Sequence, residues 1–296
     1  MITFENVNKF KLSDIILHVP EGECVGLIGA SGAGKTTMIK LACGLLVPDS
    51  GYVRTMGKEP FVYRGHYGGD FDVLMTGVPS LDKDDTVLEG FSILKEIYGL
   101  SKERFEEDYK ELSRRFGFAE YETEKIGDLS LGQRRRVELG AGFLKRPKLW
   151  ILDEPEVGLD ENAKAALGEI LSERCKEGMT VLISSHNLSE ISRVCSRIAL
   201  LEEGKMVFYG SEDRLRKNFA PIDSMIVKLS GKLPDLEDLP LKRYEVENHV
   251  LRLSYNSNHI TAAEIIGVIL QQTEISEIKI HKPNLEDILM QIRKEG

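Results

Sequence analysis

A glycine-rich stretch between an apolar run and a helical pattern constrains this chain more than any other feature. The apolar run Cys24–Ile28 leads into the spacing GxxxxGK[ST], and residues 38–42 continue as an apolar helical segment. Glycines let the backbone take positive φ, so that successive N–H groups turn inward and cradle anionic oxygens. The first turn of a following helix adds unpaired N–H groups and the positive end of its dipole. The sequence therefore predicts a strand, a phosphate-binding loop and a helix.

Two polar side chains of the predicted loop have expected roles. Lys35 is expected to reach the β- and γ-phosphates of a nucleotide, and the Thr36 hydroxyl to ligate Mg²⁺. The flanking strand and helix favour this interpretation over an ordinary glycine turn. The loop consists of Gly29, Ala30, Ser31, Gly32, Ala33, Gly34, Lys35, Thr36 and Thr37.

Length and composition limit the class of protein. The 296 residues allow one large domain with a small one, or two moderate ones, and 42% hydrophobic with 29% charged residues is typical of a globular protein with a sizeable core. A net charge of −9 argues against a broad basic surface for nucleic acid. No apolar run approaches the length of about 18 residues that predicts a membrane span, and no signal peptide is evident. The four cysteines lack metal-ligand spacing and are predicted to be reduced core residues of a cytosolic protein.

A second buried strand is expected within residues 148–155, where the apolar residues 149–152 are followed by the carboxylates Asp153 and Glu154. Such a run is typical of a central parallel strand, whose carboxyl end faces the ligand in open α/β sheets. One carboxylate there can hold Mg²⁺, directly or through its water, and the next can orient and deprotonate an attacking water. Downstream of a phosphate loop, this pair predicts nucleotide hydrolysis.

Other candidate residues flank predicted elements. His186 follows the expected strand 180–184 at the same sheet edge, where a histidine is either structural or meets a γ-phosphate. Asp160 opens an expected helix at 163–174. Phe10 lies between expected strands 2–7 and 15–19 and is either a core aromatic or a plate for a nucleotide base. Residues 129–133 precede a basic helix.

The remaining hydrophobic pattern predicts further strands and helices and a separate domain in the tail. Further strands are expected at 52–55 and 71–75, a capped helix from Thr86 and a charged helix at 102–116, whereas residues 58–72 have no assignment. The tail is expected to contain strands 222–229, 242–246 and 249–255, a helix with a Thr261/Glu264 capping box, strand 275–280 and helix 284–293. This order predicts a small α+β domain at the C-terminal end.

Taken in order over residues 1 to about 215, these motifs resemble those of the ATPase subunit of an ATP-binding cassette (ABC) transporter. Residues 29–37 are similar to its Walker A loop, 129–133 to the family signature, 150–154 to Walker B, 156–160 to the D-loop and 184–186 to the H-switch. The resemblance implies an α/β P-loop NTPase fold with a mostly parallel core sheet, an antiparallel β-subdomain and a helical subdomain at about 86–145. The ABC ATPase domain would span 1–215, and a C-terminal α+β accessory domain 216–296.

The resemblance also implies the chemistry. ATP and Mg²⁺ are the expected cofactors, with Glu154, His186 and Lys35 catalytic and Thr36 and Asp153 at the metal. The expected nucleotide contacts are the phosphate loop, Phe10, Ser130, Gly132, Gln133 and Asp160. In the family, each active site takes its loop from one copy and its signature from another. This chain has one of each, so the resemblance implies a homodimer or a heterodimer with a second ABC ATPase subunit. The other expected partner is an integral-membrane permease, which would hold the chain on the inner face of the cell membrane; no nucleic acid is expected.

The sequence departs from the family pattern at two positions, and its C-terminal end agrees with one subgroup of the family. The signature reads LSLGQ where LSGGQ is usual, with Leu131 as the change. The family places a glutamine about ten residues before Val87, at the position that Gly77 occupies here. Either another residue substitutes for it, or hydrolysis and its coupling to the membrane partner are altered. Residues 282–289 resemble the PSLEDVFL-like close of ATPase subunits in exporters of the ABC-2 type.

Three other functions fit parts of the pattern. A soluble ABC ATPase acting on nucleic acid or ribosomes would share the motifs, but the acidic net charge and the single cassette count against it. A regulatory ATP-binding subunit of low turnover would be consistent with Gly77. A small-molecule kinase would leave the signature unexplained.

Overall fold

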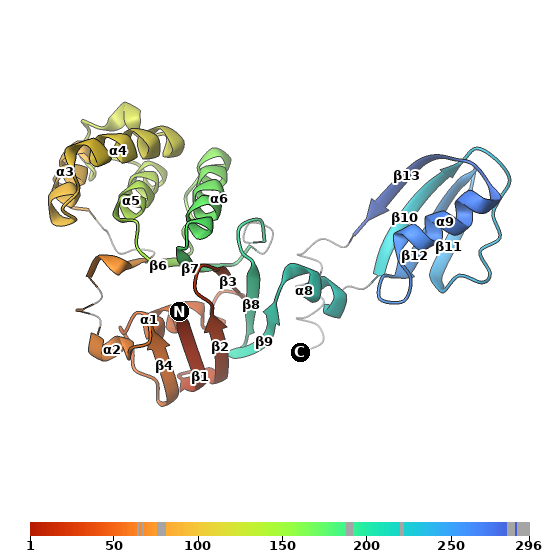
Figure 1. Cartoon of the computed structure of the whole chain (residues 1–296), viewed down its shortest axis with the longest axis horizontal. Coiled ribbons are helices and arrows are strands. Elements are labelled where there is room, and N and C mark those ends of the chain that lie inside the picture. Colours follow the sequence, from red (N-terminus) through yellow and green to blue (C-terminus); the bar gives the residue numbers. More distant parts are fainter. Residues whose placement is uncertain are drawn as a thin grey trace. The chain divides into compact units, whose positions relative to one another are not determined.

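The computed structural model describes residues 1–63, 65–66, 68–75, 81–187, 192–219, 222–282 and 288. The chain divides into two compact units, Met1–Gly210 and Ser211–Gly296, each of which is described by itself (Figure 1). The predicted boundary after residue 215 falls inside helix α8 (Glu212–Phe219) of the second unit. Among the described residues, no helix has both the length and the apolarity needed to span a lipid bilayer.

A six-stranded sheet forms the centre of the first unit. Its order is β5-β6-β7-β3-β8-β9, and every neighbouring pair is parallel except β8 with β9. All residues of β3, β6 and β7 are buried, as expected of parallel strands covered on both faces. The strands are β3 (Cys24–Ile28), β5 (Phe71–Leu74), β6 (Leu149–Asp153), β7 (Thr180–Ser185), β8 (Arg197–Glu202) and β9 (Lys205–Gly210). Because β6, β7 and β3 are adjacent, the predicted motifs at their carboxyl ends share one edge.

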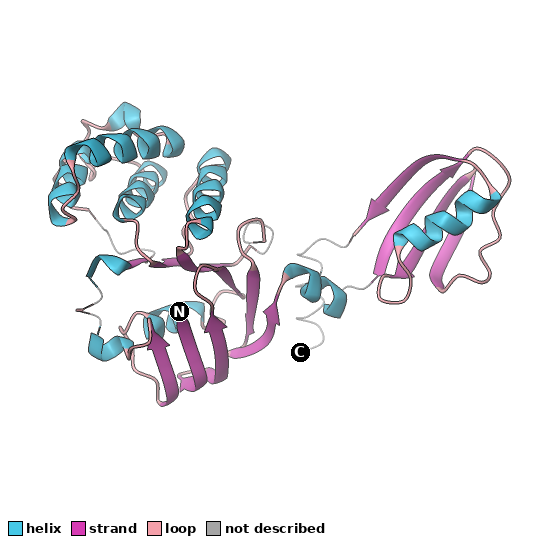
Figure 2. Ribbon diagram, in the orientation of Figure 1, coloured by secondary structure: helices cyan, strands magenta, loops and turns pink. Residues whose placement is uncertain are grey.

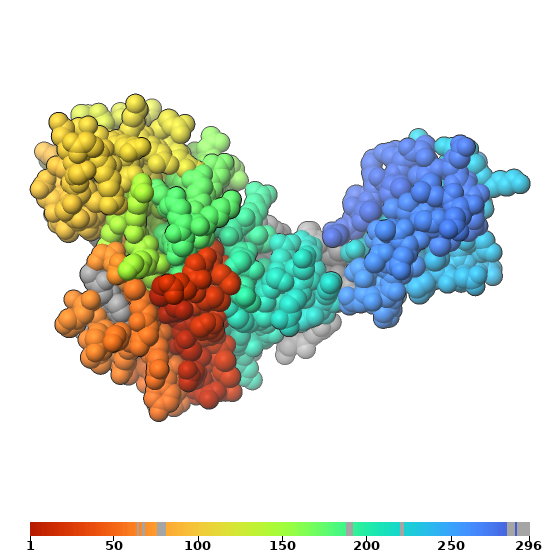
Figure 3. Space-filling model, viewed as in Figure 1, coloured from red at the N-terminus to blue at the C-terminus, as the bar shows by residue number. Residues whose placement is uncertain are grey.

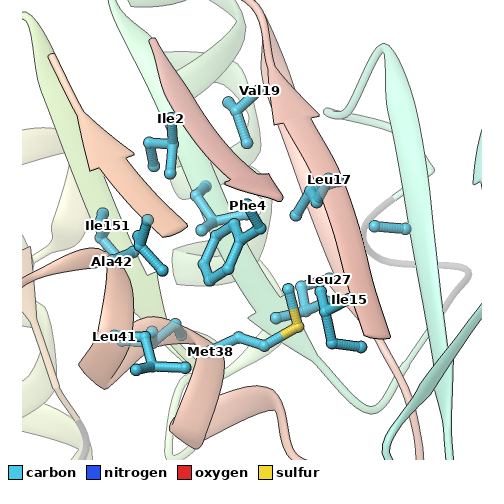
Figure 4. Close-up of a cluster of buried hydrophobic side chains, with 14 of the residues drawn as sticks. Ile2, Phe4, Ile15, Leu17, Val19, Leu27, Met38, Leu41, Ala42 and Ile151 are labelled. Atoms are coloured by element: carbon cyan, nitrogen blue, oxygen red, sulfur yellow. The ribbon is translucent and has the colours of Figure 1, made fainter. Parts of the chain in front are cut away.

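A three-stranded antiparallel sheet accompanies it, in the order β2-β1-β4. Its strands are β1 (Ile2–Lys9), β2 (Leu12–Val19) and β4 (Ser50–Thr55). Helix α1 (Lys35–Ala42) packs its buried Met38 and Leu41 against Phe4 and Ile15 of this sheet, with Leu27 of β3 in the same cluster (Figure 4). Burial of each such side chain contributes about 1.5–3 kcal/mol, which anchors the helix that begins at the phosphate loop.

Four longer helices form a layer on one side of the six-stranded sheet (Figure 2). In the space-filling view their residues, yellow to green, gather in one part of the first unit (Figure 3). The four helices are α3 (Val87–Ile97), α4 (Lys102–Phe116), α5 (Leu131–Lys145) and α6 (Glu161–Lys176). Each begins at a side-chain cap, from Thr86, Ser101, Ser130 and Asp160 in turn. A cap satisfies N–H groups that the helix leaves unpaired, so these polar residues fix where each helix starts.

The second unit is a four-stranded antiparallel sheet with helix α9 (Ala262–Gln272) on one face (Figure 2). The order β11-β12-β10-β13 places β10 between β12 and β13, the strands that α9 connects, as in a split βαβ unit. The strands are β10 (Ile222–Leu229), β11 (Leu241–Glu247), β12 (Val250–Asn256) and β13 (Ile275–His281). The capping box of Thr261 and Glu264 is present as predicted. Of the predicted helix 284–293, only Ile288 lies within the described residues.

Some elements were not foreseen. No element was predicted for residues 187–221, where β8, β9 and α8 lie. Residues 58–72 had no assignment, and α2 (Pro60–Tyr63) and the short 3₁₀ helix Gly68–Asp70 occur there. A second 3₁₀ helix spans Ala119–Tyr121. The four cysteines are free thiols; Cys24 and Cys43 lie in the core as predicted, whereas Cys175 and Cys195 are only half-buried. Burial raises the pKa of the Cys43 thiol, which is typical of an unreactive core residue.

Candidate nucleotide site

The phosphate loop turns tightly between β3 and α1. Gly34 has a φ of +114° and precedes the helix without any side-chain cap, so no side chain occupies the N–H groups of the first turn of α1. A Cβ at Gly29 would stand 2.4 Å from the carbonyl oxygen of Leu201, so only glycine fits there. Gly29, Ala33, Gly34 and Lys35 are buried, Ala30 and Thr37 are half-buried, and Ser31, Gly32 and Thr36 are exposed. An uncapped helix start with a glycine-lined approach fits an anionic phosphate.

Lys35 points back over this loop. Its Nζ donates hydrogen bonds to the carbonyl oxygens of Gly29, at 2.8 Å, and Ala30, at 3.3 Å. The same Nζ lies 3.4 Å from Oε1 of Glu154, and the lysine side chain is only 5% exposed. A buried ammonium held above a cradle of N–H groups concentrates positive charge where a nucleotide phosphate would lie.

Thr36 and Asp153 lie within hydrogen-bond distance of each other. The Thr36 hydroxyl donates to Oδ2 of Asp153 at 3.2 Å, and the Ser184 hydroxyl from β7 donates to Oδ1 at 2.6 Å. A hydroxyl and a carboxylate are hard oxygen donors, and Mg²⁺ in nucleotide sites needs only one or two protein ligands beside the phosphates. Within the described residues, no cluster of three His, Cys, Asp or Glu side chains could hold a metal by itself. The pair thus fits a Mg²⁺ that arrives with a nucleotide.

Glu154 follows Asp153 in an unusual backbone conformation. Its φ is +45°, in the left-handed region, and its N–H is held by the Ser184 carbonyl oxygen at 3.2 Å and hydroxyl oxygen at 3.0 Å. The carboxylate is 32% exposed, and its Oε1 lies 4.0 Å from Nδ1 of His186. The structure thus brings Lys35, Glu154 and His186 together at the carboxyl ends of β3, β6 and β7.

The segment 156–160 is held from within the chain. Ser185 donates a short hydrogen bond to the Glu156 carboxylate. Asp160 caps α6, its Oδ1 accepting from the N–H of Ala163 at 2.9 Å, and its Oδ2 pairs with Arg136 of α5. Both carboxylate oxygens of Asp160 therefore have partners inside this chain.

The signature residues begin α5. Ser130 and Gln133 form a capping box, in which the Ser130 N–H donates to Gln133 Oε1 at 2.9 Å and the Gln133 N–H donates to Ser130 Oγ at 3.3 Å. A Cβ at Gly132 would stand 2.7 Å from the carbonyl oxygen of Gly158, whereas the Leu131 side chain is 72% exposed. No hydrogen bond or ion pair found among the described residues joins this segment to the phosphate loop.

The two remaining predicted positions are Phe10 and Gly77. Phe10 is 73% exposed and lies 5.0 Å from Lys9 Nζ, measured to the ring centroid. The core alternative for Phe10 is therefore wrong, and its role beside a base stays a prediction. Gly77 lies outside the described residues.

Two residues that hold this site, Ser184 and Arg135, were not predicted from the sequence. Ser184 bonds Asp153 across the sheet, and Arg135 is buried under the turn after β6. For Arg135, the arginine run 134–136 directly after the signature was a signal. For Ser184, a serine in an apolar strand gave little signal.

Comparison with known proteins bears on the family. Residues 12–157 match the model of the family described as "ABC transporter". The chain is 30% identical to the Nod factor export ATP-binding protein I of Burkholderia lata, over 98% of this chain and 96% of that protein. The chain belongs to the family of ABC transporter ATP-binding subunits. As a member of this ABC ATPase family it binds and hydrolyses ATP.

Further matches agree with this family. The ABC transporter ATP-binding protein NatA of Bacillus subtilis is 30% identical over 68% of this chain and 82% of its own length. A solved structure described as the ATP binding subunit of an ABC transporter matches with a TM-score of 0.65 and 30% identity, covering 74% of this chain and 92% of that one. The predicted fold class, an α/β P-loop NTPase of the ABC type, is confirmed.

Proposed function

We propose that this ABC ATPase hydrolyses ATP with Mg²⁺, in a dimer, to drive a separate membrane permease of an exporter. The observation that carries this proposal is the convergence of Lys35, Thr36, Asp153 and Glu154 at one sheet edge, within 3.4 Å of each other in pairs. The order of the strands accounts for it, because β3 and β6 are separated only by β7.

The proposed roles follow from these positions. Lys35 and the loop N–H groups bind the β- and γ-phosphates, while Thr36 and Asp153 hold Mg²⁺. When bound, Mg²⁺ would neutralise charge on the phosphate oxygens. Glu154 accepts a proton from the attacking water, and His186 donates a hydrogen bond to the γ-phosphate. The exposed Phe10 stacks on the base.

The proposed dimer completes each site. Ser130, Gly132 and Gln133 lie at the start of α5, where the capping box uses the N–H groups of Ser130 and Gln133. No hydrogen bond among the described residues joins these three to the phosphate loop of their own chain. We assign them, with Asp160, to a nucleotide that the second subunit holds on its loop. The second subunit is either another copy or a similar ABC ATPase. Closure of the two subunits on ATP would supply the work, since ATP binds the closed state better.

The relatives support the proposed permease partner and the proposed direction of transport. A protein named for Nod factor export aligns along nearly the whole chain, including the C-terminal unit. This supports an export function over action on nucleic acid or ribosomes, and the −9 net charge agrees. The proposed place of the subunit is the cytoplasmic face of the membrane, where the permease holds it.

Purification of the tagged chain from its native membranes tests this function. We expect one integral membrane protein at a fixed ratio to the chain, and ATP hydrolysis by that complex. The Lys35→Ala chain is the matched control and should retain the membrane protein while losing hydrolysis. Recovery of RNA or ribosomal proteins in place of a membrane protein would contradict the proposal.

A further inference from the structure

Arg135 lies buried beneath the turn that carries the two site carboxylates. Its guanidinium is within hydrogen-bond distance of three consecutive carbonyl oxygens, those of Asp153 at 3.4 Å, Glu154 at 3.3 Å and Pro155 at 3.4 Å. The residue is 6% exposed. A guanidinium is always charged and presents its donors in a rigid fork, so it can hold several carbonyl groups in one arrangement.

Glu138, one turn further along α5, compensates the buried charge. Its Oε2 lies 3.3 Å from a terminal nitrogen of Arg135, and both side chains are nearly inaccessible. Burial raises the pKa of the Glu138 carboxyl, because the charged carboxylate is less favourable away from water. An apolar pair of similar size would often be as stable as a buried ion pair, so stability alone does not explain the pair.

The turn that Arg135 contacts is held from two elements. Glu154 has a φ of +45°, which residues other than glycine rarely adopt and which persists only where the surroundings hold it. Ser184 of β7 binds the N–H of Glu154, and Arg135 of α5 contacts its carbonyl oxygen. The direction of the Glu154 carboxylate, toward Lys35 and His186, therefore depends on the position of α5.

The same helix begins with the signature. Ser130 caps α5 and Arg135 lies in its second turn, so a shift of the helix start displaces both. We propose that Arg135 is a positioning residue that couples the signature to the backbone of Glu154, so that contact of Ser130 with the partner's ATP sets the catalytic base of this chain's own site. This coupling rests on the proposed function, in which the signature faces a nucleotide on the second subunit.

The test compares purified full-length variants by steady-state ATP hydrolysis and by equilibrium ATP binding. The double variant Arg135→Met/Glu138→Met removes the contacts without leaving a buried charge unpaired. We expect its kcat to fall at least tenfold, its Kd for ATP to stay within about twofold, and its Hill coefficient for ATP to fall from above 1 toward 1. Arg135→Lys should recover part of kcat, and the control Arg134→Gln, on the neighbouring arginine that donates to Gly127, should behave as wild type.

The outcomes separate this inference from the proposed function. An unchanged kcat or an unchanged Hill coefficient in the double variant overturns the coupling. A joint loss of kcat, ATP affinity and thermal stability also overturns it, because Arg135 would then be structural only. Failure of the wild-type chain to hydrolyse ATP would contradict the proposed function itself and remove the inference with it.

Discussion

The carboxylate of Glu154 lies 3.4 Å from the ammonium of Lys35, and this ion pair joins the turn after β6 to the phosphate loop. Lys35 thus has three oxygen partners before any phosphate binds, two of them loop carbonyls. Phosphate oxygens at this position would share or replace the carboxylate. Binding of a nucleotide phosphate would therefore change how firmly Lys35 holds Glu154, the proposed catalytic base.

Lys35→Ala is expected to weaken ATP binding about 10- to 100-fold, because charged hydrogen bonds contribute about 1.5–3 kcal/mol each. Calorimetric titration with ATP measures this effect. Lys40→Ala, in the last turn of the same helix, is the control and should bind ATP as wild type. Equal affinities for all three proteins would remove Lys35 from the site.

Asp153→Asn should lower ATP hydrolysis about 100-fold or more, since it removes the negative charge proposed to hold Mg²⁺. Asparagine keeps an oxygen that can accept from the Ser184 hydroxyl, so the fold should persist. Chelation of Mg²⁺ by EDTA should abolish hydrolysis in the wild type, and added Mg²⁺ should restore it. Full activity in EDTA would rule out a metal at Thr36 and Asp153.

Gly132→Ala tests the packing of the signature. The added methyl group would meet the backbone oxygen of Gly158 at 2.7 Å, so the start of α5 must shift. We expect at least a tenfold loss of kcat with little change in ATP binding by the isolated chain. Leu131→Ala changes the exposed neighbour and should leave hydrolysis near wild type. The reverse order of the two effects would contradict the proposed role of Gly132.

Glu23 and Arg197 predict a dependence of stability on pH. Their Oε2 and Nε atoms are 2.6 Å apart, and the hydrogen bond from Arg197 holds the pKa of Glu23 below its ordinary value of 4.5. A lowered carboxyl pKa stabilises the fold above that ordinary value, and the contribution is lost as pH falls through the lowered pKa. Glu23→Gln should lower the free energy of urea unfolding at pH 7 by less than about 1 kcal/mol, since the pair is partly exposed. The same difference at pH 7 and at pH 3 would contradict this assignment.

Local patterns predicted the parts of the site that are local in sequence. The glycine spacing fixed the turn into α1, and the apolar run ending at Asp153 predicted a buried parallel strand. The contact of Thr36 with Asp153 depends on the strand order β6-β7-β3, which joins residues 117 positions apart and which spacing alone does not determine. The resemblance to a family, rather than periodicity, was what assigned Thr36 and Asp153 to one metal site.

The omissions have physical causes as well. The β8–β9 hairpin turns at Glu203 and Gly204, both with positive φ, and a glutamate is an unusual residue for such a turn. Arg135 was predicted only as part of a basic helix, and its burial could not be expected, because arginine side chains are mostly exposed. Its burial follows from the carbonyl groups and the Glu138 carboxylate that satisfy it, and these come together only in the fold.

Glu154→Gln, compared with the wild type for hydrolysis and for oligomeric state in the presence of ATP and Mg²⁺, tests the central claim most directly. Loss of a general base costs about 100- to 10,000-fold in rate, and glutamine keeps the size of the side chain. We predict that the variant binds ATP, scarcely turns it over and accumulates as a dimer, whereas the wild type returns to monomers as ATP is consumed. Wild-type turnover by the variant, or a variant that stays monomeric with ATP bound, would contradict the assignment of Glu154 and of a shared site.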